Sequence, residues 1–166
     1  MNKREMEKEF MQAFDEYGDA IFRFCFLKVS EIALAEDMTQ ETFMRYWQAL
    51  RRGQEMTNTR SFLYTIAGNL AKDWYKKKKS DSLDYKMEQG FEPRERETRN
   101  AQILAEYQEA ITKISALGER DREVLFLRYT EGLDPKDIAD ILGESANAVS
   151  VRLSRAMKHL QKELGV

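Results

Sequence analysis

The sequence predicts an all-α protein of two small helical domains joined by a flexible linker, and three observations lead to this fold class. Apolar residues recur at the three- and four-residue spacing of a helix face along most of the 166 residues. Strand-type alternation is nowhere sustained for more than a few residues. Residues 80–100 lose the apolar rhythm, are mostly charged and contain Pro93, as is typical of a linker. We therefore expect one domain over residues 1–79 and another over 101–166.

Three helices are expected in the amino-terminal domain. Apolar residues from Phe10 to Phe24 step by three and four and predict the first. Ser30 can cap the second, because its hydroxyl can accept a hydrogen bond from an amide of the opening turn. Residues 53–61 have no periodicity and are predicted to form a loop. The third helix follows and ends in the lysine run 76–79, whose charges complement the helix dipole.

Four helices are expected in the carboxy-terminal domain. Gly118 is predicted to close the first of them as a left-handed residue after its last turn. Asp134 followed by Pro135 is a strong start signal for the third helix, and Gly143 ends it. The predicted ranges are 103–117, 122–129, 135–142 and 146–164.

Composition argues against several classes of protein. The 27 Lys and Arg residues nearly balance 29 Asp and Glu residues, so any site for a polyanion must be local. One cysteine, Cys25, and one histidine, His159, leave neither a disulfide framework nor a Cys/His zinc site, and we expect no metal or cofactor. No apolar run approaches the roughly 18 residues of a membrane span, and the start MNKREMEKEF lacks a secretory signal. We expect a cytoplasmic protein without membrane insertion.

The segment ADILGESANAVSVRLSRAMKHL, residues 139–160, has the form of a DNA-binding helix-turn-helix. Gly143 permits the left-handed turn between its two helices. Arginine can bind guanine O6 and N7 together, while lysine suits a phosphate. The alternative, which the pattern alone leaves open, is a helical hairpin with a merely solvated charged face. The residues expected on the face toward DNA are Asn147, Ser150, Arg152, Arg155 and Lys158.

A second basic segment runs from Lys72 to Lys79, with five lysines against Asp73 alone. Trp74 lies at helical spacing and is expected in the core, whereas the role of Tyr75 stays open. Two further side chains have modest predicted roles. Cys25 is expected to be a small buried hydrophobe, and His159 is expected to contact a phosphate or solvent.

Three segments together resemble a known family. They are ALAEDMTQETFMRYWQAL (33–50), FLYTIAGNLAKDWYKK (62–77) and the long stretch from DREVLFLRYTEGL to LSRAMKHL (121–160). In this order, and over nearly the whole chain, they are similar to bacterial RNA polymerase sigma factors of the extracytoplasmic-function (ECF) type. The resemblance implies that residues 1–79 form the region-2 domain and that 101–166 form the region-4 domain.

The resemblance also implies partners and contact residues. In the family, the helix containing AEDMTQETF binds the coiled-coil clamp of the polymerase β′ subunit, and the following helix recognises and melts the −10 promoter element. A base of the non-template strand is flipped beside the loop, here residues 53–60. The residues that match the clamp motif are Asp37, Gln40, Glu41 and Phe43. The expected −10 contacts are Asn69, Lys72, Lys76 and Lys77.

Region 4 of the family contacts duplex DNA at the −35 element and binds the polymerase β subunit. Family members are commonly held inactive by an anti-sigma factor, which the resemblance implies as a further partner. We therefore expect a sigma factor, a dissociable and non-catalytic subunit that gives core polymerase its promoter choice. One alternative is a stand-alone helix-turn-helix regulator that binds duplex DNA without polymerase. Another is a helical enzyme or adaptor, but the sequence has no phosphate-binding glycine loop, nucleophile elbow or metal-ligand motif.

Overall fold

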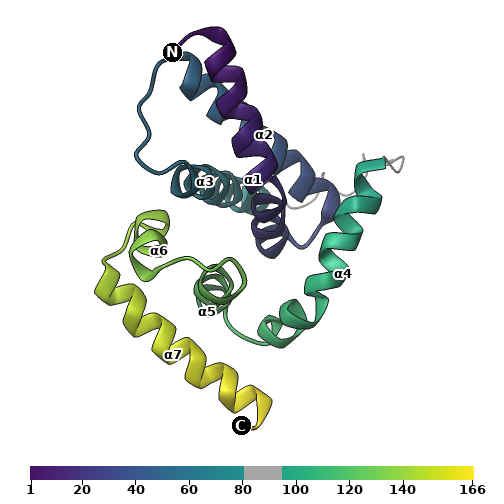
Figure 1. The fold of residues 1–166 in the computed structure, drawn as a ribbon. Helices are drawn as coiled ribbons and strands as arrows, with labels where there is room; N and C mark the ends of the chain where they lie inside the picture. The colour runs from purple at the N-terminus through teal and green to yellow at the C-terminus, as the bar shows by residue number, and fades with distance from the viewer. Residues whose placement is uncertain (81–94) are drawn as a thin grey trace. The chain divides into compact units, whose positions relative to one another are not determined.

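The computed structural model describes residues 1–80 and 95–166 (Figure 1). The described chain is helical apart from short connections, with no strand in these two ranges, so the all-α prediction is confirmed. It divides into two compact units, Met1–Ile103 (unit 1) and Leu104–Val166 (unit 2). Most of the predicted linker, including Pro93, lies outside the described residues. Among the helices that are described, none is long and apolar enough to cross a membrane.

Unit 1 is built on three long helices that pack against one another in every pairing. They are α1 (Lys3–Val29), α2 (Ile32–Arg51) and α3 (Thr59–Ser80). Aromatic rings dominate the core, where Phe24 meets Tyr64 edge to face with ring centroids 5.2 Å apart. The largest fully buried side chains are Ile21, Phe24, Tyr46, Leu63 and Tyr64.

Two helix ends in unit 1 differ from the prediction. Ser30 has a left-handed backbone with φ of 55° and closes α1, since its N–H donates to the Phe26 carbonyl at 2.8 Å. Its predicted role as the cap of the second helix is therefore wrong, and Glu31 holds that position without a side-chain hydrogen bond. α3 begins at Thr59, earlier than expected, because Asn58 Oδ1 accepts a hydrogen bond from the Ser61 amide at 3.0 Å.

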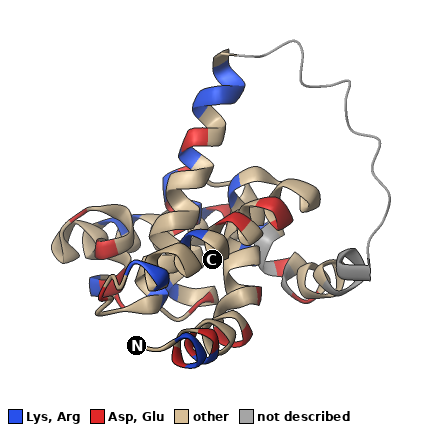
Figure 2. Cartoon of the chain, turned by 90° about the horizontal axis from the view of Figure 1, so that it is seen from above, with Lys and Arg blue, Asp and Glu red and all other residues tan. Residues whose placement is uncertain are grey.

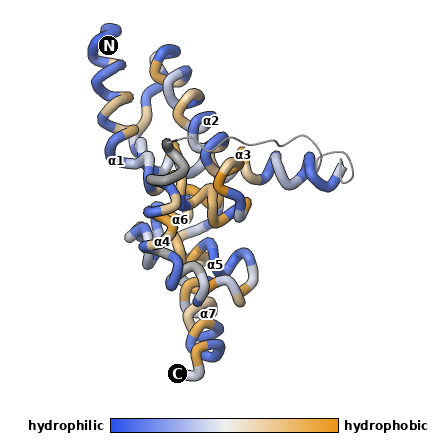
Figure 3. Tube along the Cα trace, turned by 90° about the vertical axis from the view of Figure 1, so that its right-hand side faces the viewer, coloured by the Kyte–Doolittle hydropathy of each residue, from blue (hydrophilic) through white to orange (hydrophobic). Residues whose placement is uncertain are grey.

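Unit 2 is a small bundle around the last helix. α4 (Glu95–Ser115) begins in unit 1 and ends in unit 2. The elements that follow are α5 (Glu119–Leu125), the π-helical turn η1 (Phe126–Thr130), α6 (Pro135–Leu142) and α7 (Ala146–Leu164). α7 packs against both α5 and α6, and apolar and hydrophilic residues alternate along it (Figure 3). The fully buried side chains are Val124, Phe126, Leu127, Leu133, Ile138, Val149 and Ala156.

The predicted bounds of α6 and α7 are confirmed, but Gly118 is not the left-handed residue that was expected. Its φ is −60°, and it precedes α5 as the N-cap. The predicted short helix 122–129 is longer and ends in a widened turn, in which the Glu131 amide donates to the Phe126 carbonyl at 3.1 Å. Gly118 therefore begins the helix that follows it and does not close the helix before it.

Gly143 offers a direct test of the turn between α6 and α7. Its φ is 68°, and an added Cβ would meet no atom within 4 Å, so backbone strain is the only cost of a side chain there. We expect Gly143→Ala to lower the free energy of unfolding by about 1 kcal/mol. The control is Gly18→Ala inside α1, also in open space, which should stabilise by about 0.5–1 kcal/mol. Denaturant titrations that gave both variants the same sign would contradict this account.

Cys25 is 1% exposed, which confirms its prediction as a buried hydrophobe. Burial raises the pKa of the thiol from 9.0 to about 12. Above pH 9 the unfolded thiol ionises while the folded one stays protonated, so this contribution to stability is complete below pH 9 and is lost as the pH rises toward 12.

At pH 8 we expect a thiol reagent to label Cys25 only as the protein unfolds in denaturant. Rapid labelling of the native protein would contradict the buried position.

Candidate functional site

The first candidate surface is the polar side of α2. Asp37 and Gln40 are exposed, and Glu41 is half-buried. Glu41 pairs within the helix with Arg45, whose Nε lies 3.0 Å from Oε1. Because the three residues stand at i, i+3 and i+4, they share one side of the helix. Of the side chains matched to the clamp motif, these three are available to a partner.

Phe43 is different, because its ring is in the core. It is 2% exposed and meets the ring of Phe14 at 5.0 Å between centroids and that of Phe10 at 6.2 Å. A side chain in this position cannot itself touch a partner. The expectation that Phe43 contacts polymerase directly is therefore corrected, since the ring instead holds α2 against α1.

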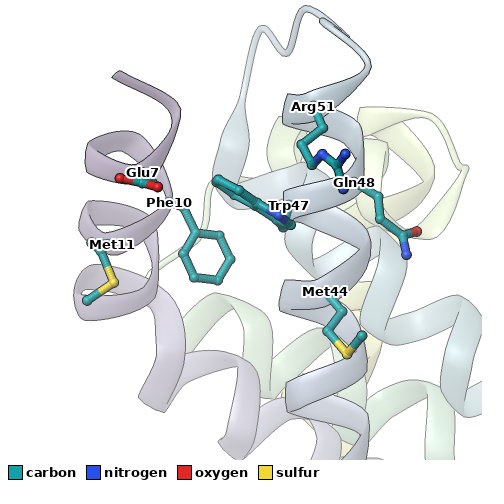
Figure 4. A pocket seen from close by; sticks show the side chains of 7 residues that line it. All are labelled: Glu7, Phe10, Met11, Met44, Trp47, Gln48 and Arg51. Atoms are coloured by element: carbon teal, nitrogen blue, oxygen red, sulfur yellow. The ribbon is translucent and has the colours of Figure 1, made fainter. Parts of the chain in front are cut away.

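An open apolar groove of about 510 Å³ lies beside this surface, between α1 and α2 (Figure 4). Met11 and Met44 are more than half exposed at its edges, while Phe10 and Trp47 contact edge to face at 5.5 Å. Its lining is Glu7, Phe10, Met11, Met44, Trp47, Gln48 and Arg51. Sequence reasoning missed Met44, although it follows Gln40 by four residues and so lies on the same helix side. Met side chains are flexible and polarisable, so such a groove can adapt to an apolar side chain.

The second candidate surface is the carboxy-terminal part of α3. Asn69, Lys72 and Lys76 stand at i, i+3 and i+7 and are all exposed, as is Lys77. Lys and Arg mark the last turns of this helix in Figure 2. Asp73, which is also exposed, is the acidic side chain among them. The structure thus brings the four predicted −10 residues onto one accessible stretch of helix.

Trp74 is not in the core, contrary to expectation. It is half-buried, its ring meets that of Tyr75 at 4.9 Å, and Lys78 Nζ lies 4.8 Å from its centroid. Tyr75 is 37% exposed, and its hydroxyl donates to the Lys28 carbonyl. Trp74 does lie at helical spacing from the apolar residues before it. Beyond Ala71, however, no side chain of α3 is fully buried, so an apolar residue at this spacing is not part of the core. An aromatic and cationic cluster lies here instead.

The third candidate surface is α7, presented by a tight turn. Gly143 closes α6 with a left-handed backbone, and Ser145 begins α7 by accepting a hydrogen bond from the Ala148 amide at 3.1 Å. Val149 and Ala156 are fully buried and fix which side of α7 faces its own domain. The opposite side is therefore free to face another molecule.

Four of the five predicted −35 residues are exposed, namely Asn147, Ser150, Arg155 and Lys158. Val151 and Ser154 are also exposed and lie on the same outer side, since Val151 stands four residues before Arg155 and Ser154 four residues before Lys158. Ser154 was not predicted as a contact residue. The sequence could have indicated it, because positions 147, 151, 154 and 158 are spaced four, three and four residues apart and so share one side of the helix.

Two basic side chains of α7 turn away from this outer side. Arg152, predicted to contact DNA, is half-buried, and its Nη2 lies 2.7 Å from Oε1 of Glu144 in its own domain. His159 Nδ1 lies 2.7 Å from Oδ2 of Asp121 in α5, and so the histidine contacts a carboxylate rather than only solvent. Both contacts join α7 to its own domain. In neither described range do three His, Cys, Asp or Glu side chains gather as a metal site would require.

Comparisons with known proteins match both units. The model of sigma-70 region 2 matches residues 13–80, and that of sigma-70 region 4 matches residues 107–160. Together they cover well over half of the chain, in the predicted order. The chain belongs to the sigma-70 family. The candidate surfaces on α2 and α3 fall within the region-2 match, and the surface on α7 falls within the region-4 match.

Curated relatives show that this sigma factor is of the ECF type. The ECF sigma factor SigW of Bacillus subtilis is 28% identical over an alignment of 175 positions, which covers 98% of this chain and 92% of SigW. The probable sigma factor RfaY of Xanthomonas campestris pv. campestris is 32% identical over 139 residues. That match covers 81% of this chain but only 35% of RfaY, so the chain spans about a third of that relative.

Solved structures show the same fold. The sigma factor RpoE from Bartonella quintana, crystallised with the anti-sigma factor NepR, matches with a TM-score of 0.72 at 25% identity, covering 96% of this chain and 98% of that one. CnrH, solved with the cytosolic domain of CnrY, matches with a TM-score of 0.67 at 22% identity, covering 96% and 89%. These findings favour a sigma factor over a stand-alone helix-turn-helix regulator.

Proposed function

We propose that this sigma factor binds core RNA polymerase through α2 and directs it to promoters through contacts of α3 with the −10 element and of α7 with the −35 element. The observation that carries the proposal is the exposure of polar or basic side chains at each segment that matches the family regions. The activity is binding and DNA opening, and no chemistry on a substrate is proposed.

For the polymerase, the proposal uses the polar side of α2. Asp37, Gln40 and Glu41 offer carboxylate and amide groups that can accept charge-assisted hydrogen bonds from a basic coiled coil such as the β′ clamp. The neighbouring groove and Met44 would receive an apolar side chain of the same partner. Phe43 would act only by holding α2 in place.

At the −10 element, α3 would hold melted single-stranded DNA. Extruding a base costs about a few kcal/mol of stacking, which contacts to the extruded base and the phosphates must offset. Asn69 can hydrogen-bond a base edge, and Lys72, Lys76 and Lys77 can follow the backbone. The exposed part of Trp74 and the ring of Tyr75 add a stacking surface close to these lysines.

At the −35 element, α7 would enter the major groove with its outer side. Arg155 is exposed and can bind guanine with two hydrogen bonds, while Asn147 suits adenine. Ser150 can donate to either base, and Val151 can contact a thymine methyl. Lys158, one or two turns further along, would bind a phosphate.

Two weak DNA contacts on one scaffold can give specific binding. When polymerase holds both units, the second contact becomes intramolecular and overall affinity rises without any new interaction. The near balance of 27 basic and 29 acidic residues limits nonspecific attraction of the free subunit to DNA. We expect the protein to act in the cytoplasm, where polymerase acts.

The partner set includes two further proteins. By family resemblance we propose the polymerase β subunit as a contact of unit 2. We also propose an anti-sigma factor as an inhibitor, because the Bartonella quintana relative was crystallised with one. An inhibitor of this kind would cover the surfaces on α2 or α7.

The deciding experiment is in vitro transcription of fragmented genomic DNA by bacterial core polymerase, with and without the purified protein, followed by mapping of new 5′ ends. We expect start sites that require the protein and share two spaced upstream elements. If no new starts arose and the protein alone retained duplex DNA, the chain would instead act as a stand-alone regulator.

The lysine run at the end of α3 supplies a salt-dependence test. We expect replacement of Lys76–Lys79 by glutamine to flatten the plot of open-complex affinity against salt by up to about 0.7 per lost contact to single-stranded phosphate. Equilibrium titrations from low to moderate salt measure the slope. The control replaces the exposed basic residues Lys3, Arg4 and Lys8 of α1 by glutamine. An unchanged slope in the α3 variant would show that its lysines are merely solvated.

A further inference from the structure

Arg152 and Glu144 form a short ion pair within unit 2. Nη2 of the arginine lies 2.7 Å from Oε1 of the glutamate, and the two side chains are only 23% and 26% exposed. Ion pairs between fully exposed side chains contribute little, but partial burial reduces the screening by water. This pair joins the turn after α6 to the second turn of α7, which is the proposed recognition helix.

The position of Arg152 on α7 explains why it reaches the turn. At about 100° per residue, Arg152 lies roughly 60° from the buried Val149, whereas Arg155 lies roughly 120° from it on the outer side. Long side chains on a helix lean toward its N-terminus. Arg152 therefore leans along the edge of the domain interface toward residue 144, while Arg155 can project into a groove.

Glu144 occupies a constrained place in the turn. Its amide donates to the Ala139 carbonyl at 3.0 Å, and it stands between the left-handed Gly143 and the capping Ser145. Its second oxygen, Oε2, is buried and accepts no hydrogen bond from any residue in the described ranges. Arg152 thus supplies a positive charge at short range from this carboxylate.

We infer that Arg152 is a positioning residue, which holds the turn and the recognition helix together by neutralising Glu144, and that it does not contact the bases of the −35 element. The inference rests on the proposed function. Without Arg152, an uncompensated and partly buried carboxylate would remain close to the N-terminus of α7, where DNA phosphates would approach. That charge would destabilise the turn and repel the phosphate backbone.

The experiment uses four full-length variants: Arg152→Met, Glu144→Gln, the double variant of both, and Arg155→Met as the matched control. Methionine keeps most of the aliphatic length of arginine and removes its charge. Transcription by core polymerase is measured on a promoter library with a randomised −35 element, which gives the overall output and the base preference separately. Calorimetric unfolding of the same proteins is measured without DNA.

We expect Arg152→Met to lower transcription by about tenfold at every −35 sequence, without changing the base preference. Glu144→Gln should stay within about threefold of wild type, and the double variant should return to that level because no unpaired charge remains. The unfolding temperatures should follow the same order. Arg155→Met, in contrast, should alter the base preference.

Two results would overturn the inference. A changed base preference in Arg152→Met would make the arginine a base-contacting residue. Equal losses in Arg152→Met and in the double variant would show that it acts independently of Glu144. If the wild-type protein supported no transcription, the proposed function would fail, and calorimetry would still decide whether Glu144→Gln rescues the stability lost with Arg152.

Discussion

Replacing Asp37 and Gln40 together by alanine is expected to remove most binding to core polymerase while leaving unit 1 folded. Both side chains are exposed on one side of α2, so their loss should change the free energy of unfolding by no more than about 0.5 kcal/mol. Hydrogen bonds to charged groups contribute about 1.5–3 kcal/mol each, so we expect the loss of two to lower the affinity by at least about a hundredfold.

The measurement is titration of labelled sigma factor with core polymerase, together with thermal unfolding of the free protein. Gln12→Ala with Asp15→Ala is the matched control, because these exposed residues have the same types and the same i, i+3 spacing on α1. Wild-type affinity in the α2 variant would refute the clamp assignment, and a similar loss in the α1 control would show that the effect is not local.

Arg155→Ala is expected to have the largest effect on promoter choice. Arg155 lies on the outer side of α7, and the loss of a two-bond contact with guanine costs about 1–3 kcal/mol. Transcription from promoters substituted at each −35 position should show a relaxed preference at one position and a weaker output from the best promoter.

Lys158→Ala separates base contact from phosphate contact. This exposed lysine lies on the same side of α7, and its loss should weaken binding about uniformly across −35 sequences and reduce the salt slope. If Arg155→Ala also acted uniformly, Arg155 would be assigned to a phosphate and the base preference to other residues of α7.

Much of the fold could be predicted because local signals and tertiary packing agree. α6 begins at Pro135 and ends before Gly143, as expected, since a first-turn proline and a left-handed glycine act through the backbone itself. Ser30 and Gly118 were assigned to the wrong helix ends. Each residue stands between two helices and can serve either one, so the path of the chain decides which.

Single side chains of the candidate site were harder to predict than the surfaces. The family resemblance placed Phe43 at the polymerase surface, but a phenylalanine beside Phe10 and Phe14 lies in the core. Trp74 shows the opposite error, because apolar spacing continues on α3 where no side chain beyond Ala71 is fully buried. Periodicity identifies a helix face, and only the neighbouring helices determine whether that face is covered.

The all-α class, the presence of two units, the turn before the last helix and the family could all be inferred from the sequence, because these depend on periodicity, backbone restrictions and ordered motifs. Which charged side chains remain available to a partner depends on the packing of the helices. Arg152 and Arg155 are three residues apart and chemically identical, yet one meets Glu144 and the other is exposed. The physical reason is that a contact with residue 144 depends on how the turn folds back on α7, which spacing along one helix does not specify.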